Sequence, residues 1–362
     1  MMNWPNHGGQ PEKLKQLFNI KMDRELLDFS ANLNPLGPPS WLKATLDEHY
    51  EKITRYPDPS YSKSILSIAD HEGVEQDNVL LTNGGAEAIF LVAKYFENKK
   101  AVIVHPTFSE YERACKHYDI DVEDIFYEQE NSFNLPTSVI KEKIKENDVI
   151  FLCRPNNPTG TVIAEEDLQL YLEEGKKTET YIVVDEAFVD FLPTSIPSLS
   201  TWLASYPNLI LLRSLTKLYT IPGLRIGYIL AQPTIINVLK NEQIPWSVNS
   251  LVDAVIPKLL EDGSFLENTR AWLSEQSESV HGILAELDFY ISPTQVNFYL
   301  LRDKKHPKRT EELFYFLLEH GILTRHTHNF KGLNGEFLRI AIRAKEENER
   351  LIAVLQNWRN ES

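Results

Sequence analysis

From about residue 76, the chain alternates short apolar runs, each bounded by turn residues, with segments whose apolar positions recur at helical spacing. The apolar runs predict buried strands at 79–82, 101–104, 149–153, 181–185, 209–213 and 226–231. Segments 86–96 and 165–177 have the helical period. Strands that alternate with helices in this way predict an α/β fold, with a mostly parallel sheet covered on both faces.

The pattern changes after about residue 245. There we expect a long helix at 264–287, short strands within 289–303, a helix near 308–320, then the segment "FLRIAIR" and a last helix. These elements predict a smaller α+β domain. The first forty residues are rich in Pro, Gly and Asn, which predicts an arm and loop rather than a core element. The expected parts are an N-terminal arm and substrate loop at 1–40, a large domain at 41–245 and a small C-terminal domain at 246–362.

Composition narrows the classes of function. The chain has 362 residues, with 37 Lys and Arg against 52 Asp and Glu, and its net charge of −15 opposes nucleic acid or an anionic membrane as a partner. The two cysteines, Cys115 and Cys153, provide neither a disulfide framework nor a zinc site, so no metal is expected. Without a leader pattern or an apolar run of membrane length, the sequence predicts a soluble, unprocessed, cytoplasmic protein.

Ligands of open α/β sheets bind beyond the carboxyl ends of the strands, so the residues that follow each strand are informative. Strand 79–82 is followed by "NGGAE", in which Gly84, Gly85 and Ala86 offer backbone N–H groups at a helix start, as a phosphate requires. An ordinary glycine-rich turn is the alternative. Strand 149–153 is followed by "RPNNPTG", a turn that contains Asn157.

The next two strand ends carry charged residues. Asp185 and Glu186 stand at the tip of an apolar strand, where a carboxylate usually meets a cation or a hydrogen-bond donor; a helix N-cap would also explain them. Lys217 follows directly on a core strand, with Arg225 beyond it. A desolvated lysine near positive charge has a lowered pKa and forms Schiff bases with aldehydes. The alternative is a lysine that reaches water.

Together these groups match what pyridoxal 5′-phosphate needs. Asp185 would keep the ring nitrogen protonated, and Asn157 would donate to the ring hydroxyl. Phe108, after strand 101–104, would cover the ring. The phosphate would be held by the backbone at 84–86 with Ser214, Thr216 or Arg225.

The segments "NNPTG", "DEAF" and "SLTKLYTIPGLRIGY" resemble fold-type I pyridoxal-phosphate enzymes of the aminotransferase class I/II family. The resemblance implies a seven-stranded, mostly parallel sheet in the large domain. It implies that Lys217 binds the cofactor covalently, that Asp185 contacts the ring nitrogen and that Asn157 contacts the ring hydroxyl. Tyr56 of "RYPDPSY" would reach the cofactor phosphate from the other subunit, which implies a homodimer with shared active sites.

The same resemblance gives "FLRIAIR" the arginine that grips the substrate carboxylate. That arginine would be Arg339, with Arg343 as the second choice. A surface ion pair on an edge strand is the structural alternative.

A narrower resemblance covers nearly the whole chain. The segments "HGG", "LDFSANLNPLG", "RYPDPSY", "DEAFVDF", "QIPWSVN" and "FLRIAIRAKEENERL" are similar to the threonine-phosphate decarboxylase branch of cobalamin biosynthesis. Histidinol-phosphate aminotransferases share the cofactor residues but usually have tyrosine after "DEA", where this chain has Phe188. The expected reaction is therefore decarboxylation of L-threonine O-3-phosphate, with transamination of histidinol phosphate as the alternative.

The narrower resemblance also implies a site for the substrate phosphate, formed by His7, Gly8, Gly9, Asn32 and Arg325. A mobile terminus would equally explain His7, and a structural role would explain Arg325. A pyridoxal-phosphate-binding regulator would need an appended DNA-binding module, and the sequence predicts none.

Overall fold

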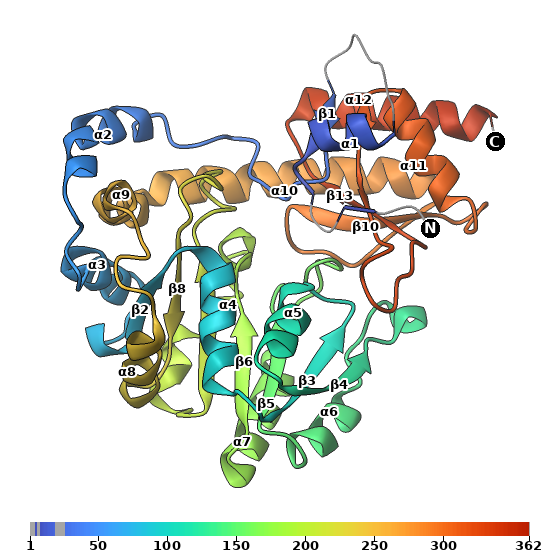
Figure 1. Cartoon of the computed structure of the whole chain (residues 1–362). Coiled ribbons are helices and arrows are strands. Elements are labelled where there is room, and N and C mark those ends of the chain that lie inside the picture. Colours follow the sequence, from blue (N-terminus) through green and yellow to red (C-terminus); the bar gives the residue numbers. More distant parts are fainter. Residues whose placement is uncertain (1–3, 6–7, 19–25, 362) are drawn as a thin grey trace.

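The computed structural model describes residues 4–5, 8–18 and 26–361, and its largest element is a sheet of seven strands (Figure 1). The order is β2-β8-β7-β6-β5-β3-β4. The strands are β2 (Val79–Thr82), β3 (Lys100–His105), β4 (Asp121–Phe126), β5 (Val149–Cys153), β6 (Tyr181–Asp185), β7 (Leu209–Ser214) and β8 (Gly227–Leu230). Strand β8 runs antiparallel to both neighbours, and the other pairs are parallel. The predicted α/β class with a mostly parallel sheet is confirmed.

Strand β4 is the one strand of this sheet that the hydrophobic pattern does not reveal. Its sequence, "DVEDIF", contains three acidic residues, and most of its side chains remain at least partly exposed. It lies at the edge of the sheet and pairs only with β3. An edge strand with few buried positions lacks the apolar run that marks the central strands.

Helices cover both faces of the sheet, because successive strand residues point to opposite sides. One face packs against α4 (Gly84–Tyr95), α5 (Glu110–His117) and α8 (Pro233–Glu242). The other packs against α3 (Ser62–Glu72), α6 (Thr137–Ile144), α7 (Glu165–Thr178) and α9 (Ser250–Glu261). In β6, Val183 belongs to the first core and Val184 to the second.

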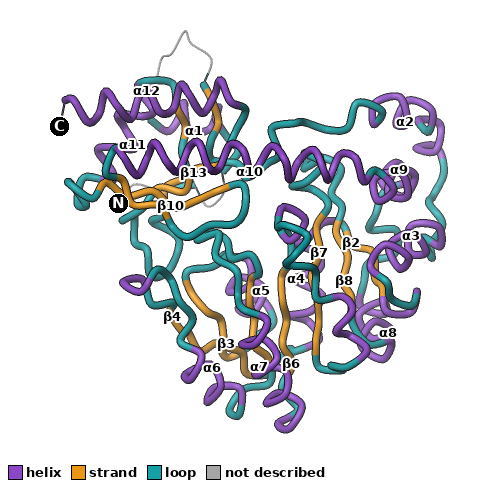
Figure 2. Tube along the Cα trace, turned by 180° about the vertical axis from the view of Figure 1, so that it is seen from behind, coloured by secondary structure: helices purple, strands orange, loops and turns teal. Residues whose placement is uncertain are grey.

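A second, four-stranded sheet has the order β12-β13-β10-β9 and is antiparallel throughout. Its strands are β9 (Phe289–Ile291), β10 (Phe298–Asp303), β12 (Arg325–His326) and β13 (Leu338–Ala341). They share a core with α10 (Gly263–Glu286), α11 (Thr310–Glu319) and α12 (Lys345–Glu361). Figure 2 shows α10 running from α9 to this sheet. The α+β composition predicted for the C-terminal part is confirmed.

The N-terminal segment differs from its prediction. After α1 (Pro11–Leu17), β1 (Leu27–Asp28) pairs in parallel with β11 (Ile322–Leu323), and Phe29 is fully buried. Residues that were expected in a loop therefore belong to the core of the C-terminal part. The sequence pattern did not show this, because a strand of two residues is too short for its period to be recognised.

The remaining elements are short. They are α2 (Leu42–Glu48) and the 3₁₀ helices η1 (Tyr50–Thr54), η2 (Gln76–Asn78), η3 (Gln129–Asn131), η4 (Val189–Phe191) and η5 (Ser200–Ala204). Within the described part of the chain, no helix combines the length and apolar content that a membrane span requires.

Beneath the carboxyl end of the sheet, on the α3 and α7 face, lies a network of buried charges. Arg213 of β7 donates to Glu72 of α3 at 2.9 Å and to Asp190 at 3.1 Å. Next to it, Arg154 donates to Glu186 at 2.9 Å. Burial acts to raise the pKa of Glu72, but Arg213 and the Tyr228 hydroxyl outweigh burial, so this pKa lies below its usual value.

We expect Arg213→Met to lower the free energy of unfolding by about 3–5 kcal/mol near neutral pH, because Glu72 and Asp190 lose their buried partner. A urea titration measures the change. Since the depressed Glu72 pKa stabilises the fold only above the pKa of the unfolded chain, the difference from wild type should shrink as the pH falls. Lys94→Met, which removes a surface pair with Glu97, is the control and should leave the midpoint nearly unchanged. An Arg213→Met protein as stable as wild type would contradict this prediction.

Candidate active site

A cavity of about 280 Å³ lies where the N-terminal segment, the second sheet and the carboxyl ends of the large-sheet strands meet. Eight of the residues predicted for the site line it: Gly8, Gly9, Asn32, Phe108, Asn157, Lys217, Arg325 and Arg339. Phe188 also lines the cavity, beside Lys217. The structure therefore gathers residues that are more than 300 positions apart in the sequence.

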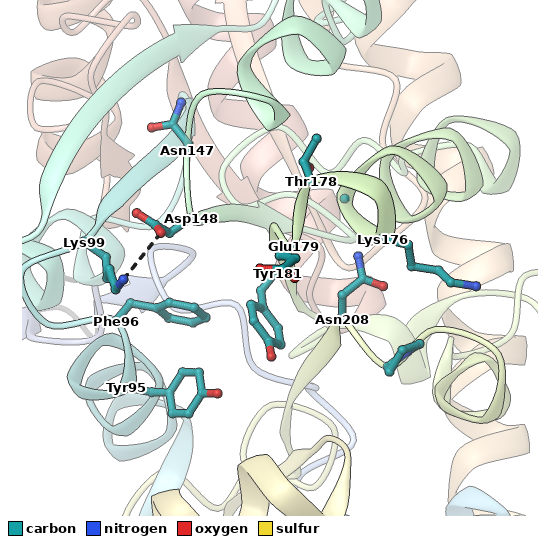
Figure 3. Close-up of a pocket in the computed structure, with 12 residues that line it drawn as sticks. Tyr95, Phe96, Lys99, Asn147, Asp148, Lys176, Thr178, Glu179, Tyr181 and Asn208 are labelled. Carbon is teal, nitrogen blue, oxygen red and sulfur yellow. Dashed lines mark ion pairs between the residues drawn. The ribbon is translucent and has the colours of Figure 1, made fainter.

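A larger hollow, about 660 Å³, lies at the opposite end of the strands (Figure 3). Asp148 before β5, Tyr181 at the start of β6 and Asn208 before β7 contribute to it, and Lys99 pairs with Asp148 at 3.8 Å. None of the residues predicted for the site lines this hollow. The cavity that contains Lys217 is therefore the candidate active site.

Lys217 lies three residues beyond β7 and is only partly exposed, toward the cavity. Its Nζ donates to Ser214 Oγ at 3.4 Å and lies 5.8 Å from the centre of the Phe188 ring. Burial lowers the pKa of Lys217, and Arg225 lowers it further, although Asp185 acts in the opposite direction. A larger fraction of this amine is neutral, and hence nucleophilic, than of a surface lysine at the same pH.

Asp185 is the last residue of β6 and is buried. The Tyr111 hydroxyl donates to Oδ2 at 2.7 Å, and the Ala187 N–H donates to Oδ1 at 2.9 Å. Burial raises the pKa of Asp185, against the effect of these two donors and of Lys217. Tyr111 was not among the predicted site residues. It lies in the first turn of α5, and its place shortly after Phe108 in the sequence was the available signal.

The start of α4 forms a tight cradle with Arg225 and Ser214. Gly84 has φ +78°, and a Cβ atom there would lie 2.6 Å from Arg225 Nη2. A Cβ on Gly227 would lie 2.8 Å from the backbone nitrogen of Gly85, and one on Gly85 would touch Ser214 at 4.0 Å. Backbone N–H groups, a hydroxyl and a guanidinium thus meet at a helix N-terminus, which fits a phosphate group.

Two other residues predicted for the phosphate occupy the same region. Ala86 follows in the first turn of α4, and the buried Thr216 hydroxyl donates to the carbonyl of Ile226 at 3.3 Å. This hydrogen bond stabilises the loop that contains Arg225. The Thr216 hydroxyl oxygen can still accept hydrogen bonds.

Arg339 of β13 is buried in the cavity wall. It donates to Asn157 Oδ1 at 2.6 Å and to the Ser30 carbonyl at 2.7 Å, while its Nε has no hydrogen-bond partner among the described residues. Burial lowers the pKa of Arg339 to about 9. Arg343, by contrast, pairs with Glu347 at 2.8 Å and does not line the cavity.

Arg325 of β12 stands directly opposite Arg339 in the antiparallel pair of β12 and β13. It donates to the Pro5 carbonyl at 3.1 Å and to Asn329 Oδ1 at 2.7 Å, and burial lowers the pKa of Arg325 to about 10. Like charges that face each other across strands are destabilising. An anion in the cavity would relieve the repulsion between these two guanidinium groups.

The N-terminal loop closes the cavity from the other side. A Cβ on Gly8 would collide with the Ser30 carbonyl, and the Gly9 N–H donates to Ser30 Oγ at 2.8 Å. Asn32 is buried, and neither atom of its amide has a hydrogen-bond partner among the described residues. A buried amide without a partner in the protein can form hydrogen bonds with a polar ligand.

Two predicted residues are not part of this arrangement. Tyr56 is 81% exposed, packs against Trp246 with ring centres 4.8 Å apart, and does not line the cavity of its own chain. His7 lies outside the described residues.

The family model of aminotransferase class I and II matches residues 24–355. Threonine-phosphate decarboxylase of Salmonella typhimurium is 35% identical over 356 residues, which cover 97% of this chain and 96% of that protein. The solved structure of histidinol-phosphate aminotransferase from Clostridium acetobutylicum has a TM-score of 0.87 at 29% identity, and covers 93% of this chain and 100% of that one. L-threonine-O-3-phosphate decarboxylase from Porphyromonas gingivalis has a TM-score of 0.80 at 27% identity, over 92% and 99% of the two chains. The chain therefore belongs to the aminotransferase class I and II family and is a pyridoxal-phosphate-dependent enzyme.

Proposed function

We propose that this enzyme decarboxylates L-threonine O-3-phosphate to (R)-1-amino-2-propanol O-phosphate, a step of cobalamin biosynthesis. The observation that carries the proposal is the pair of buried arginines, Arg325 and Arg339, facing each other in the cavity that contains Lys217. Two adjacent cationic sites suit an amino acid that bears both a carboxylate and a phosphate. The similarity to threonine-phosphate decarboxylases supports the same substrate.

The residues around Lys217 would hold the cofactor. Lys217 would bind its aldehyde carbon, Asp185 its ring nitrogen and Asn157 its ring hydroxyl. Its phosphate would sit at Gly84, Gly85, Ala86, Ser214, Thr216 and Arg225, and Phe108 would cover the ring. When bound, the cofactor supplies a ring that accepts the electron pair of the broken bond.

The substrate would be held from the side of the second sheet. Arg339 would bind the carboxylate, and Arg325, Asn32 and the Gly8–Gly9 backbone would bind the phosphate, with His7 as a further predicted contact. A fixed carboxylate determines which bond at Cα is broken. Lys217, displaced by the substrate amine, would then return a proton to Cα.

Transamination of histidinol phosphate is the alternative, since it uses the same cofactor residues. Phe188 favours decarboxylation: its buried ring lies 5.8 Å from Lys217 Nζ and packs edge-on against Phe298 at 4.9 Å. Histidinol-phosphate aminotransferases usually have a tyrosine hydroxyl at this position. The apolar ring leaves the cofactor without that donor.

We also propose that the active enzyme is a homodimer with shared active sites. Large apolar side chains are exposed on η1, on the segment that follows it and on the loop before α9, where Tyr56 is 81% and Ile244 is 75% exposed. Arg225 of the phosphate cradle is exposed as well. A second subunit would cover these residues and bring its own Tyr56 to the cradle. The cytoplasmic location, the absence of a nucleic-acid partner, the absence of a metal and the domain limits at 40 and 245 stay predictions.

The lowered pKa of Lys217 predicts how the cofactor attaches. As the pH rises, Lys217 should become neutral before ordinary lysines do, because its pKa lies below the ordinary value of 10.5. The amount of cofactor that borohydride links covalently to Lys217 should therefore reach half of its maximum below pH 10.5. Lys217→Ala should abolish both the trapped adduct and the visible absorbance of the bound cofactor. The matched control is Lys141→Ala, which removes an exposed lysine and should behave as wild type. An adduct that survives in Lys217→Ala would overturn the assignment.

The reaction itself is tested by incubating the loaded protein with L-threonine phosphate in the absence of a keto acid. We expect sustained release of carbon dioxide and formation of the amine phosphate, and no glutamate from histidinol phosphate with 2-oxoglutarate in a parallel assay. Arg339→Lys should lower kcat/KM by about 100-fold, because lysine lacks the bidentate grip, whereas Arg343→Lys should change it little. Glutamate from the second assay, with no carbon dioxide from the first, would make this enzyme an aminotransferase.

Shared active sites are tested by mixing two inactive variants, Lys217→Ala and Tyr56→Ala, after partial unfolding. In a mixed dimer, one site would combine an intact Lys217 with an intact Tyr56 from the other subunit. Equal mixing should therefore restore about one quarter of the wild-type activity. The same mixture without subunit exchange is the control. Mixed dimers that remain inactive would refute a Tyr56 contribution across the interface.

A further inference from the structure

Tyr111 contacts two residues of the proposed cofactor site. It lies on α5 and is 1% exposed. Its ring stacks on Phe151, with centres 5.9 Å apart and an angle of 17°, and meets Phe108 edge-on at 6.0 Å. Because packing holds the ring on both sides, the hydroxyl has a single direction, and it donates to Asp185 Oδ2 at 2.7 Å.

The groups around Asp185 come from every element packed against it. The Cys153 thiol lies on the neighbouring strand β5, Arg213 is on β7, and Lys217 follows β7. The Ala187 N–H occupies Oδ1, so Tyr111 is the only side-chain hydrogen-bond donor to Asp185 among the described residues.

The two weak acids near Asp185 stay protonated. Burial raises the pKa of Tyr111 well above its usual value, and Asp185 raises it further. Burial, again helped by Asp185, raises the pKa of Cys153 to about 12. Throughout the working range of pH, Tyr111 is therefore a neutral donor that cannot take the proton of Asp185 or lose its own.

We propose that Tyr111 is a positioning residue that acts through Asp185, keeping it a carboxylate and thereby keeping the shared proton on the ring nitrogen of the cofactor. The proposal rests on the cofactor site proposed above, but not on which substrate reacts there. Burial alone favours the neutral acid, and a donor to the carboxylate opposes burial. Without Tyr111, the proton shared by the ring nitrogen and Asp185 would move toward Asp185, and the ring would accept electrons less well.

Tyr111→Phe separates this role from packing, because phenylalanine keeps the contacts with Phe151 and Phe108 and removes only the hydroxyl. The readout is the pH at which the visible absorbance of the lysine-bound cofactor changes, measured without substrate. A protonated ring lowers that midpoint by charge repulsion, so Tyr111→Phe should raise it by about one pH unit. With the substrate that the enzyme proves to use, kcat should fall about tenfold while KM stays within about twofold.

Two comparisons make the test specific. Tyr299→Phe also removes a buried hydroxyl, one with no hydrogen-bond partner among the described residues, and it should leave the midpoint unchanged. In an Asp185→Asn background, Tyr111→Phe should cause no further shift, because its effect passes through the carboxylate. An unchanged midpoint in Tyr111→Phe, or an equal shift in the Asp185→Asn background, would overturn the proposal.

Should Tyr111→Phe not fold, Tyr111→Gln and Tyr111→Met provide the same comparison. These side chains are similar in length, and only glutamine can donate to Asp185. The glutamine variant should keep a midpoint nearer to wild type, and equal midpoints would refute the proposal. A wild-type protein that shows no visible absorbance with the cofactor would contradict the cofactor site itself, which distinguishes that failure from a failure of Tyr111.

Discussion

The cost of burying charge at the carboxyl end of β5, β6 and β7 governs how this molecule is built. Side chains alternate between the two faces of a strand, so the adjacent residues Asp185 and Glu186 point to opposite sides of the sheet. On the α3 and α7 side, Glu186 meets Arg154 at 2.9 Å, and Arg213 meets Glu72. Those charges are neutralised inside the protein and hold the strand ends together whether or not a ligand is bound.

On the opposite side of the sheet, cationic side chains near the cavity lack carboxylate partners among the described residues. Among the described residues, no ion pair neutralises Lys217 or Arg339, and Asp185 is the one carboxylate directly behind the site. A folded chain retains buried, unmatched cations only when something outside the chain compensates them. The cofactor phosphate has the sign that this face lacks, and so would the phosphate and the carboxylate of the proposed substrate. An enzyme with a net charge of −15 thus presents a locally cationic cavity.

The central strands could be predicted from the sequence because both of their faces are buried, so each strand is an uninterrupted apolar run. The polar residue at the end of each run is then easy to recognise. Lys217, Asp185 and Asn157 were predicted in this way. The edge strand β4 has no such run, and Tyr111 resembles any core tyrosine of an amphipathic helix until Asp185 is placed beside it. Arg325 and Arg339 lie opposite each other because of the register between β12 and β13. The alternation of side chains along a strand does not specify that register.

The N-terminal segment links these electrostatic features to substrate binding. The Pro5 carbonyl accepts from Arg325, and the Ser30 carbonyl accepts from Arg339. Backbone carbonyls stabilise a guanidinium group without neutralising its charge, so these contacts fix the positions of both arginines and leave their positive charge in place. Because the same segment contributes Gly8, Gly9 and Asn32 to the cavity, an anion that binds both arginines would stabilise the packing of this segment against the second sheet. Binding of the proposed substrate would then be thermodynamically coupled to the packing of this segment.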